Sequence, residues 1–427
     1  MTEPAHAARD RPTARFRPSL VARAPARRVA PVGCVALGLL AACASDARVG
    51  EGIAVDTLNG VVRIVNLAST PAASRPAAEL SEAPLRIGRV DGEGPDVFGE
   101  VDVVAVGPDR EVYVADGVAL EIRVFSAGGE FLRAFGRQGE GPGEFEAVDG
   151  LVVGADGSVW VRDPRLARVS RFGPDGAFED SFRLERSFFI FSDGTTFWRD
   201  SAGRVYDRIV TSTGIDEPDR YGLVVYAPDA APDTVFVVTH RPRRTFAREG
   251  DRTVLGMNAP FSPQPLVAVS AGGTIAAGLG DSYRIVVTNR VGDTLRLFAR
   301  ELEADPVSDA EGAAALERLR ARAEEMAPGA TLDDVDLPGT KPSIVQIHAD
   351  GRGGWWVGRY RGERDPDDPT AALPTEYDVF DGTGRLLGGV TVPPVLVYQI
   401  GPDYVAGVET DPLGVQYAVV YAFASTR

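Results

Sequence analysis

The sequence has few of the residues that usually hold metals, disulfides or membranes. Its 427 residues include only two cysteines, Cys34 and Cys43, and three histidines. The apolar run near its start, Val29 to Ala42, has 14 residues, whereas a helix needs roughly 20 to cross a bilayer. These shortages argue against a histidine-rich metal centre and against a membrane-spanning helix in this region.

The apolar run instead has the features of an export signal. Seven arginines precede it, and it ends in Leu40-Ala41-Ala42-Cys43. A basic start, a short apolar middle and small residues before a cleavage point predict a signal peptide over residues 1–42. The alternative is an ordinary secreted protein in which Cys43 occurs by chance.

The Leu-Ala-Ala-Cys ending resembles a bacterial lipobox. The resemblance implies that the Cys43 thiol receives a diacylglycerol and that the new amino terminus is acylated, for example with palmitate. No aspartate follows at the second position, because Ala44 and Ser45 come next. By resemblance to lipoprotein sorting, this favours a cell-envelope protein of the outer membrane, facing the periplasm or the cell surface.

Removal of the leader makes the charge balance more acidic. The leader carries seven arginines and two acids, so residues 43–427 hold 38 basic and 59 acidic side chains, a formal net charge of −21. Such a surface repels phosphate backbones and anionic headgroups, which excludes nucleic acid as an expected partner and leaves the acyl anchor as the membrane contact. With Cys43 lipidated, no thiol remains for a disulfide, a zinc site or a nucleophile. Burial alone must hold the fold, and 385 residues suffice for a large core.

A repeat of 47 residues is the strongest internal signal. Residues 92–135 match residues 139–182 without a gap, beginning with Gly-Glu-Gly-Pro in both copies. Inside the first copy, four short apolar segments are separated by Gly/Asp/Ser turns, as in Val101 to Val106 followed by Gly-Pro-Asp-Arg. A period of 40 to 50 residues with four strands is typical of a propeller blade.

The repeat resembles the NHL repeat. The resemblance rests on Val112-Tyr113-Val114-Ala115-Asp116, on Val159-Trp160-Val161-Arg162-Asp163, and on Arg168-Val169 with Phe172. It departs at Glu121, which holds the position of Arg168, so an ion pair from that position to Asp116 is not expected. More broadly, the chain resembles the six-bladed β-propeller lipoproteins of bacteria. This resemblance implies an all-β fold of six four-stranded antiparallel blades over residues 60–427, behind a lipidated tether over residues 43–59. We expect the protein to be a monomer.

The last group of strands is one strand short. Residues 395–400, 404–409 and 416–423 supply three strands, and an incomplete ring would expose an unpaired edge. We expect the missing outer strand to come from the N-terminal side. Leu85-Arg86-Ile87-Gly88 aligns with the outer strand of the first repeat and is the first choice, and Val61 to Asn66 is the second.

One helix interrupts the strands, as a helical insertion at about residues 308–327. Ser308-Asp309-Ala310-Glu311 fits a capping box, and Pro328-Gly329 ends the helix. Leu316, Leu319, Ala323 and Met326 fall on one face. The insertion either packs on the rim or forms a lid over a binding site.

Four aspartates are the candidate site residues. Asp102 and Asp149 stand at the start of the innermost strands of the two repeats, and Asp116 and Asp163 follow the second strands at the same end. Converging carboxylates there could bind Ca²⁺ through oxygen ligands. Alternatively, these aspartates accept hydrogen bonds from backbone N–H groups of their own turns. No other cofactor is expected.

Three further features have a structural and a functional interpretation. Trp355 and Trp356 alternate across one strand, so that one belongs to the core and the other could face a ligand. Arg241-Pro242-Arg243-Arg244 is either a solvated loop or a contact for an acidic partner. His348 is most simply an ordinary histidine at a strand end.

Two functions from different classes fit this sequence. The first is an exported, lipid-anchored binding or scaffold module for a protein, peptide or glycan, without catalysis. The alternative is a metal-dependent hydrolase similar to the propeller lactonases, with its site at the mouth of the central channel. No nucleophile elbow or His-Asp pair favours an enzyme, but lactonase ligands are scattered in sequence and are compatible with this chain.

Overall fold

The structure is a computed structural model of the chain. It describes residues 48–184, 196–211, 218–227, 230–362, 373 and 375–424. The predicted signal peptide and Cys43 lie outside these residues. No helix among the described residues is long and apolar enough to cross a membrane.

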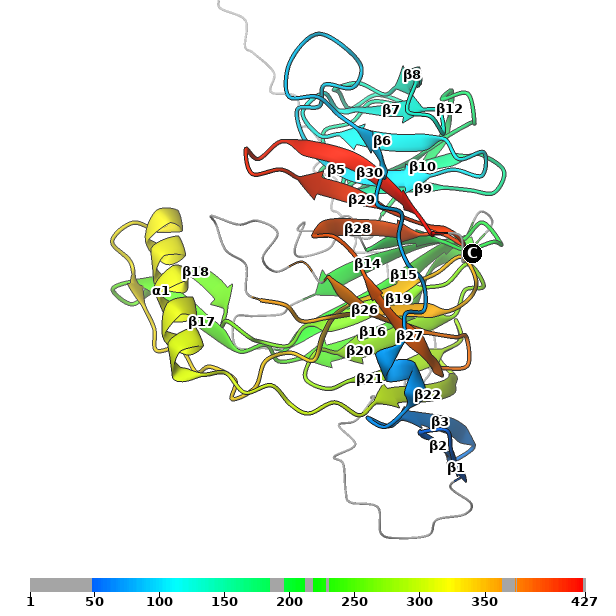
Figure 1. The fold of residues 1–427 in the computed structure, drawn as a ribbon. Coiled ribbons are helices and arrows are strands. Elements are labelled where there is room, and N and C mark those ends of the chain that lie inside the picture. Colours follow the sequence, from blue (N-terminus) through cyan, green and yellow to red (C-terminus); the bar gives the residue numbers. More distant parts are fainter. Residues whose placement is uncertain are drawn as a thin grey trace, which may run out of the picture. The chain divides into compact units, whose positions relative to one another are not determined.

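Most of the described chain forms four-stranded antiparallel sheets in sequence order (Figure 1). The first two sheets are the 47-residue repeats. The first contains β5 (Val101–Val106), β6 (Val112–Asp116), β7 (Glu121–Phe125) and β8 (Phe131–Phe135). The second contains β9 (Gly150–Val153), β10 (Val159–Asp163), β11 (Arg168–Phe172) and β12 (Phe178–Arg183).

The next two sheets keep the same strand order with longer outer strands. The third contains β13 (Phe197–Arg199), β14 (Val205–Thr211), β15 (Asp219–Ala227) and β16 (Ala230–His240). The fourth contains β19 (Pro265–Val269), β20 (Ile275–Leu279), β21 (Arg284–Thr288) and β22 (Thr294–Arg300).

The remaining two sheets complete the series. The fifth contains β24 (Ile344–Ala349), β25 (Trp355–Arg359), β26 (Glu376–Phe380) and β27 (Leu386–Thr391). The sixth contains β28 (Val395–Ile400), β29 (Tyr404–Thr410), β30 (Gln416–Ala422) and the early strand β4 (Leu85–Ile87), which pairs with β30. The prediction that Leu85–Gly88 supplies the last outer strand is therefore confirmed by this pairing.

The sheets pack face against face around their first strands. β6 and β10 are buried over their whole length, because each is covered on both sides by neighbouring sheets. Val103, Phe145 and Val161 belong to one core cluster that joins the first and second sheets. The first strands of successive sheets lie next to one another, including β28 and β5. Four-stranded sheets that meet along their first strands are the arrangement of a β-propeller.

The two ends of the sheets are connected in different ways. At one end, hairpin turns of five residues recur. In each turn, the N–H of the first residue donates to the carbonyl of the fifth, and the N–H of the fourth residue donates to the carbonyl of the first. These turns begin at residues 107, 126, 154, 173, 200, 270, 289, 350 and 381. The fourth position has a positive φ, as at Gly129 (85°) and Gly384 (97°), which glycine adopts without a steric cost. We call this the turn end.

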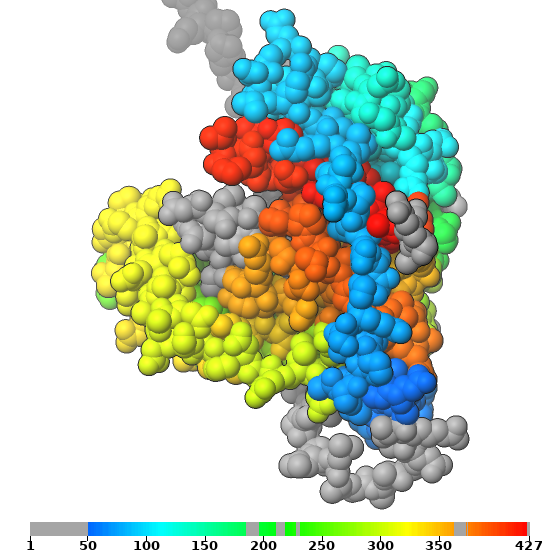
Figure 2. Space-filling model, in the orientation of Figure 1, coloured from blue at the N-terminus to red at the C-terminus, as the bar shows by residue number. Residues whose placement is uncertain are grey.

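The opposite end, where the first strands begin, carries the long connections. We call it the mouth end. The chain between β16 and β19 adds the hairpin β17 (Arg244–Glu249) and β18 (Arg252–Asn258) there. The chain between β22 and β24 adds α1 (Asp309–Met326) and β23 (Thr331–Leu332), and β23 pairs with β17 to make a three-stranded sheet. In Figures 1 and 2 this inserted region (green and yellow) extends away from the other sheets.

The helix prediction is confirmed in position and in its start. Ser308 accepts from the Glu311 N–H and the Glu311 side chain accepts from the Ser308 N–H, which forms the expected capping box. Its buried face is Gly312, Ala315, Leu319 and Ala323, whereas Met326 is exposed. A Cβ on Gly312 would lie 3.2 Å from Leu337, so the helix packs on the segment that follows it, which favours the packing interpretation over the lid.

Three other expectations differ from the structure. The expected tether over residues 43–59 contains β1 (Arg48–Gly50) and β2 (Ile53–Leu58), which join β3 (Val61–Asn66) at the outer edge of the fourth sheet. Residues 241–243 form the expected loop, but Arg244 begins β17 and pairs with the buried Asp219. Both Trp355 and Trp356 are buried, because the fifth sheet is covered on both faces.

Candidate functional site

The mouth end brings together acids from the first three sheets. Asp102 stands in β5, Asp149 directly precedes β9, and Asp207 lies in β14 beside the start of β13. Asp149 is close enough to Asp102 for its charge to raise the pKa of the Asp102 carboxyl. Asp102 and Asp149, which the sequence places at the same end, are thus near enough for their charges to interact.

A buried arginine links two of these acids. Arg162 donates from Nε to Asp149 Oδ1 at 2.7 Å, from a terminal nitrogen to Asp207, and from Nη2 to Thr196 Oγ1 at 3.2 Å. Burial raises the pKa of Asp149 to about 6, against the lowering effect of Arg162. Burial also raises the pKa of Asp207. One guanidinium between two carboxylates leaves this cluster short of positive charge.

Asp102 has no such partner. Within the part of the chain that the structure describes, no hydrogen bond or ion pair reaches its carboxylate, and its backbone carbonyl accepts from the Tyr398 hydroxyl. Burial, followed by the charges of Glu100, Asp149 and Asp116, raises the pKa of Asp102 to about 7. A Cβ on Gly117 would lie 2.1 Å from Asp102 Oδ2, so glycine at 117 leaves the space that this carboxylate occupies.

Asp116 and Asp163 serve their own turns. Asp116 accepts from the N–H groups of Val118 and Ala119 at 3.1 and 3.0 Å. Asp163 accepts from the N–H groups of Glu146 and Leu166 at 2.8 and 2.9 Å. Each aspartate thus has a donor in its own turn, as the turn interpretation expects, and Asp163 also accepts from Glu146 in the segment that leads into β9.

The ion pair that was not expected at Asp116 exists, but from another position. Arg123 lies 3.2 Å from Asp116 and 2.7 Å from Glu121. In the second repeat, Arg168 donates to the carbonyls of Gly141 and Glu144 rather than to an aspartate. Arg123 stands two residues after the position in β7 that aligns with Arg168, and it places a cation beside Asp116.

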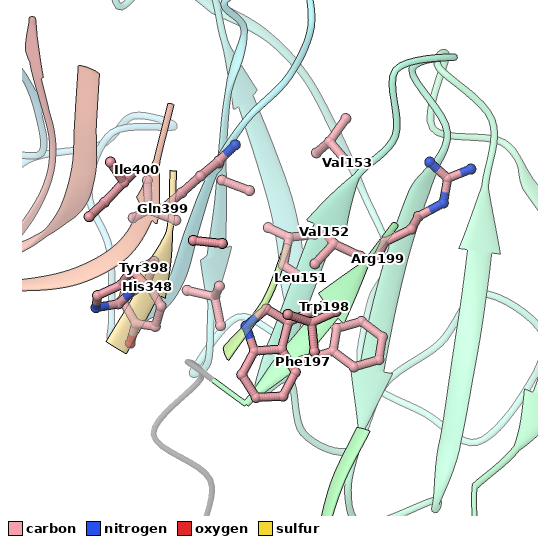
Figure 3. Close-up of a pocket in the computed structure, with 15 residues that line it drawn as sticks. Leu151, Val152, Val153, Phe197, Trp198, Arg199, His348, Tyr398, Gln399 and Ile400 are labelled. Atoms are coloured by element: carbon pink, nitrogen blue, oxygen red, sulfur yellow. The ribbon is translucent and has the colours of Figure 1, made fainter. Parts of the chain in front are cut away.

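A cavity of about 170 Å³ lies deeper along the same first strands (Figure 3). The first to sixth sheets each contribute to its lining, mainly through the second halves of their first strands. The large polar or aromatic members are Phe197, Trp198, Arg199, His348, Tyr398 and Gln399. His348 and Tyr398 lie across the cavity from Trp198 (Figure 3). Asp102 and Asp149 are not part of this lining, since they stand at the mouth end of the strands.

Sequence reasoning missed these cavity residues. His348 was interpreted as an ordinary histidine at a strand end, although it is buried and lies 3.4 Å from Gln346 Oε1. Trp198 and Arg199 stand 47 residues after Leu151 and Val152, the same spacing that separates the two repeats. This signal could have located the short strand β13, because equivalent blade positions line the same channel.

The described residues contain no group of three His, Cys, Asp or Glu side chains suited to hold a metal ion. Among the described residues, the mouth thus offers the Asp102 carboxyl group without a hydrogen-bond donor and with a raised pKa, beside a second acid held by Arg162. Such groups suit the binding of a cationic or hydrogen-bonding ligand, and they also suit proton transfer.

Comparison with known proteins adds information on the fold alone. No protein-family model matches the chain, and a search of curated proteins finds no match. Among solved structures, a member of the DUF4221 family from Bacteroides vulgatus is similar in fold, with a TM-score of 0.51 and 12% identity, over 81% of this chain and 98% of that one.

Two further structures are less similar in fold. A protein described as exported, from Bacteroides fragilis, has a TM-score of 0.45 and 12% identity over 85% of this chain and 100% of that one. The calcium-binding protein regucalcin from Agrobacterium tumefaciens has a TM-score of 0.38 and 10% identity over 81% of this chain and 95% of that one.

Proposed function

We propose that this chain is an exported, lipid-anchored β-propeller of six blades in a closed ring, and that its mouth end binds a protein, peptide or glycan without catalysis. The anchor is Cys43, and the location is the outer membrane of the cell envelope.

The observation that carries this proposal is the difference between the two ends. The turn end repeats one short hairpin turn, as between β9 and β10 or between β21 and β22. The mouth end has the inserted sheet β17–β18–β23, helix α1, and the carboxylate of Asp102, which no donor of the described residues reaches. Binding residues concentrate on long connections that a rigid scaffold positions.

The closed ring is supported by pairings between distant parts of the chain. The Val101 N–H donates to Gln416 Oε1 at 2.8 Å, and Gln399 holds both the N–H and the carbonyl of Val106. At the turn end, Arg110 of the first sheet pairs with Asp403 of the sixth. In a closed ring each sheet packs between two neighbours, and only short outer edges remain.

The binding proposal is tested by capture from envelope extracts on immobilised residues 43–427. We expect a partner that is retained by the wild type and lost on Asp102→Asn with Asp149→Asn. The matched control is Asp156→Asn with Asp175→Asn, which removes two exposed acids at the turn end. A partner lost equally from both variants, or from neither, would contradict a binding site at the mouth.

The pKa of about 7 at Asp102 favours one alternative, a metal-dependent hydrolase of the lactonase type. A bound cation would stabilise the carboxylate and would lower this pKa. Metal analysis of the purified protein separates the two. Stoichiometric Ca²⁺ or Zn²⁺ that is lost on Asp102→Ala, together with lactone hydrolysis, would replace the binding proposal by the hydrolase.

The anchor has its own test. Cells that produce the chain are labelled with radioactive palmitate. We expect label in the wild type and none in Cys43→Ser, with the protein found in the outer-membrane fraction. Label that persists without Cys43, or no label in either protein, would contradict the anchor.

A further inference from the structure

The outer edge of the fourth sheet is built differently from the other sheet edges. Strands β1, β2 and β3 extend it, and β3 pairs with β22 in parallel, Val62 beside Arg296 and Ile64 beside Phe298. The four-stranded repeat does not require this addition. In Figures 1 and 2 these strands (blue) lie at the surface next to β22.

One face of the added strands belongs to the core. Ile53, Ile64 and Phe298 are buried in a cluster with Phe380 and Leu386 of the fifth sheet. Side chains alternate across a strand, so the residues between them point to the other face. The register of the three strands fixes which residues share that second face.

The second face is also apolar. Asp56 and Arg63 lie on it together with six aliphatic residues of β2, β3 and β22, and we call this set the edge face: Ala54, Leu58, Val61, Val65, Leu295 and Leu297 with Asp56 and Arg63. Leu58 is 47% and Leu295 is 37% exposed. Among the described residues, none of the six belongs to a core cluster. The outer face of an antiparallel sheet is normally polar, so this surface lacks a partner.

The charges on the edge face compensate each other. Asp56 and Arg63 are opposite each other in the register, and they form an ion pair. No net charge therefore opposes the transfer of this face to a less polar environment. The pair can remain together at an interface where water is still present.

The position of Cys43 identifies what covers the edge face. Four residues separate Cys43 from Arg48, the first residue of β1. Five fully extended residues span about 17 Å. Acyl chains on Cys43 therefore hold the bilayer surface within this distance of β1, and β1 is the outermost strand of the same sheet.

We propose that the edge face is a membrane-docking surface, which rests on the proposed anchor at Cys43. The acyl chains and the aliphatic residues of β2, β3 and β22 contact the same lipid surface. Docking orients the fourth sheet toward the membrane and leaves the mouth end accessible from the side. The ligand of this surface is a lipid bilayer, not a second copy of the chain.

The test uses residues 43–427, in which Cys43 is the only thiol. One myristoyl chain is coupled chemically to that thiol, because a single chain gives only marginal membrane affinity and leaves room for a second contribution. Partition into phosphatidylcholine vesicles is measured for the wild type and for Leu58→Asp with Leu295→Asp. The control is Val118→Asp with Leu413→Asp, which adds the same charge at sites that are 68% and 81% exposed.

We expect partition of the edge-face variant to fall about tenfold and partition of the control to stay within twofold of the wild type. Thermal melting of each variant verifies that the fold is retained. Equal partition of all three proteins would overturn the proposal. It would also be overturned if the wild type forms a dimer without vesicles and the edge-face variant does not. Chemical coupling makes this result independent of palmitate labelling in cells, so failure of the anchor and failure of the docking surface are distinguished.

Discussion

At the residue scale, Asp102 and Arg162 represent opposite solutions for a charge at the mouth. Arg162 is buried and shares its donors among Asp149, Asp207 and Thr196. Asp102 is partly buried without a donor, and its charged form is disfavoured by neighbouring acids. The first arrangement supports the fold, whereas the second costs stability and suits a site for a ligand.

The cost at Asp102 depends on pH. The pKa of this acid is higher in the folded protein than the ordinary value of 3.8, so between about pH 4 and pH 7 the folded state binds more protons than the unfolded state. The free energy of unfolding therefore falls as pH rises through this window and the contribution becomes constant above it. The displacement corresponds to at most about 4 kcal/mol, and partial exposure reduces this to about 2 kcal/mol.

We accordingly expect Asp102→Asn to match the wild type at pH 4 and to be more stable by about 2 kcal/mol at pH 8. Urea unfolding at both pH values measures the difference. The control is Asp109→Asn, the same chemical change at an exposed turn. A stabilisation that is equal at pH 4 and pH 8 would contradict the raised pKa.

Arg162→Ala is expected to be strongly destabilising. It leaves Asp149 and Asp207 buried without their shared donor, which costs about 3–5 kcal/mol. Arg165→Ala, three residues away and exposed, is expected to change the free energy of unfolding by less than about 0.5 kcal/mol. Similar urea midpoints for the two variants would show that the buried cluster does not support the fold.

Sequence reasoning located part of this site. Asp102 and Asp149 could be placed at the mouth because the repeat aligns their strands. The roles of Arg162 and Asp207 could not be predicted, because they depend on how close the second and third sheets lie. The third sheet departs from the sequence repeat. Trp198 and Arg199 were missed because β13 has only three residues and lacks an alternating pattern of its own.

At the element scale, β4 has the largest effect for its length. Its three residues supply the outer strand of the sixth sheet, with Ile87 opposite Ala418. Ile87 is buried in a cluster with Val101 and Phe125 of the first sheet. The strand therefore joins the two sheets in which the described propeller begins and ends.

Ile87→Ala is expected to lower the free energy of unfolding by about 2–4 kcal/mol, because it removes buried methyl groups and leaves a cavity. Leu132→Ala, in the exposed outer strand β8, is expected to cost less than about 1 kcal/mol. Urea unfolding at one pH compares the two. An equally small loss for both would indicate that β4 is dispensable for the core.

The elements that follow the repeat were predictable and those that interrupt it were less so. Gly/Asp turns and short apolar segments located the strands of the first two sheets. The hairpin β17–β18 was missed because arginines interrupt the apolar pattern of its strands and because it has no counterpart at the 47-residue offset. Helix α1 was found because its capping box and its end signal are local.

At the scale of the whole molecule, the sheets form a scaffold with a simple end and an elaborate end. The N-terminal strands add a third surface, the edge face, beside the proposed anchor. A ligand site at the mouth and a lipid contact at the outer edge are compatible, because they use different ends of the strands and different sheets. In the binding proposal, the three-stranded sheet β17–β18–β23 and α1 belong to the ligand surface rather than to the membrane contact.

The most direct test of the mouth as the ligand-binding end is site-specific photocrosslinking in producing cells. Benzoylphenylalanine replaces Val118, in the mouth-end turn after β6, or Val291, in the turn between β21 and β22; these side chains are 68% and 66% exposed. We predict a discrete crosslinked partner from position 118 that disappears with Asp102→Asn and is absent from position 291. The same adduct from position 291, or from position 291 alone, would contradict the account.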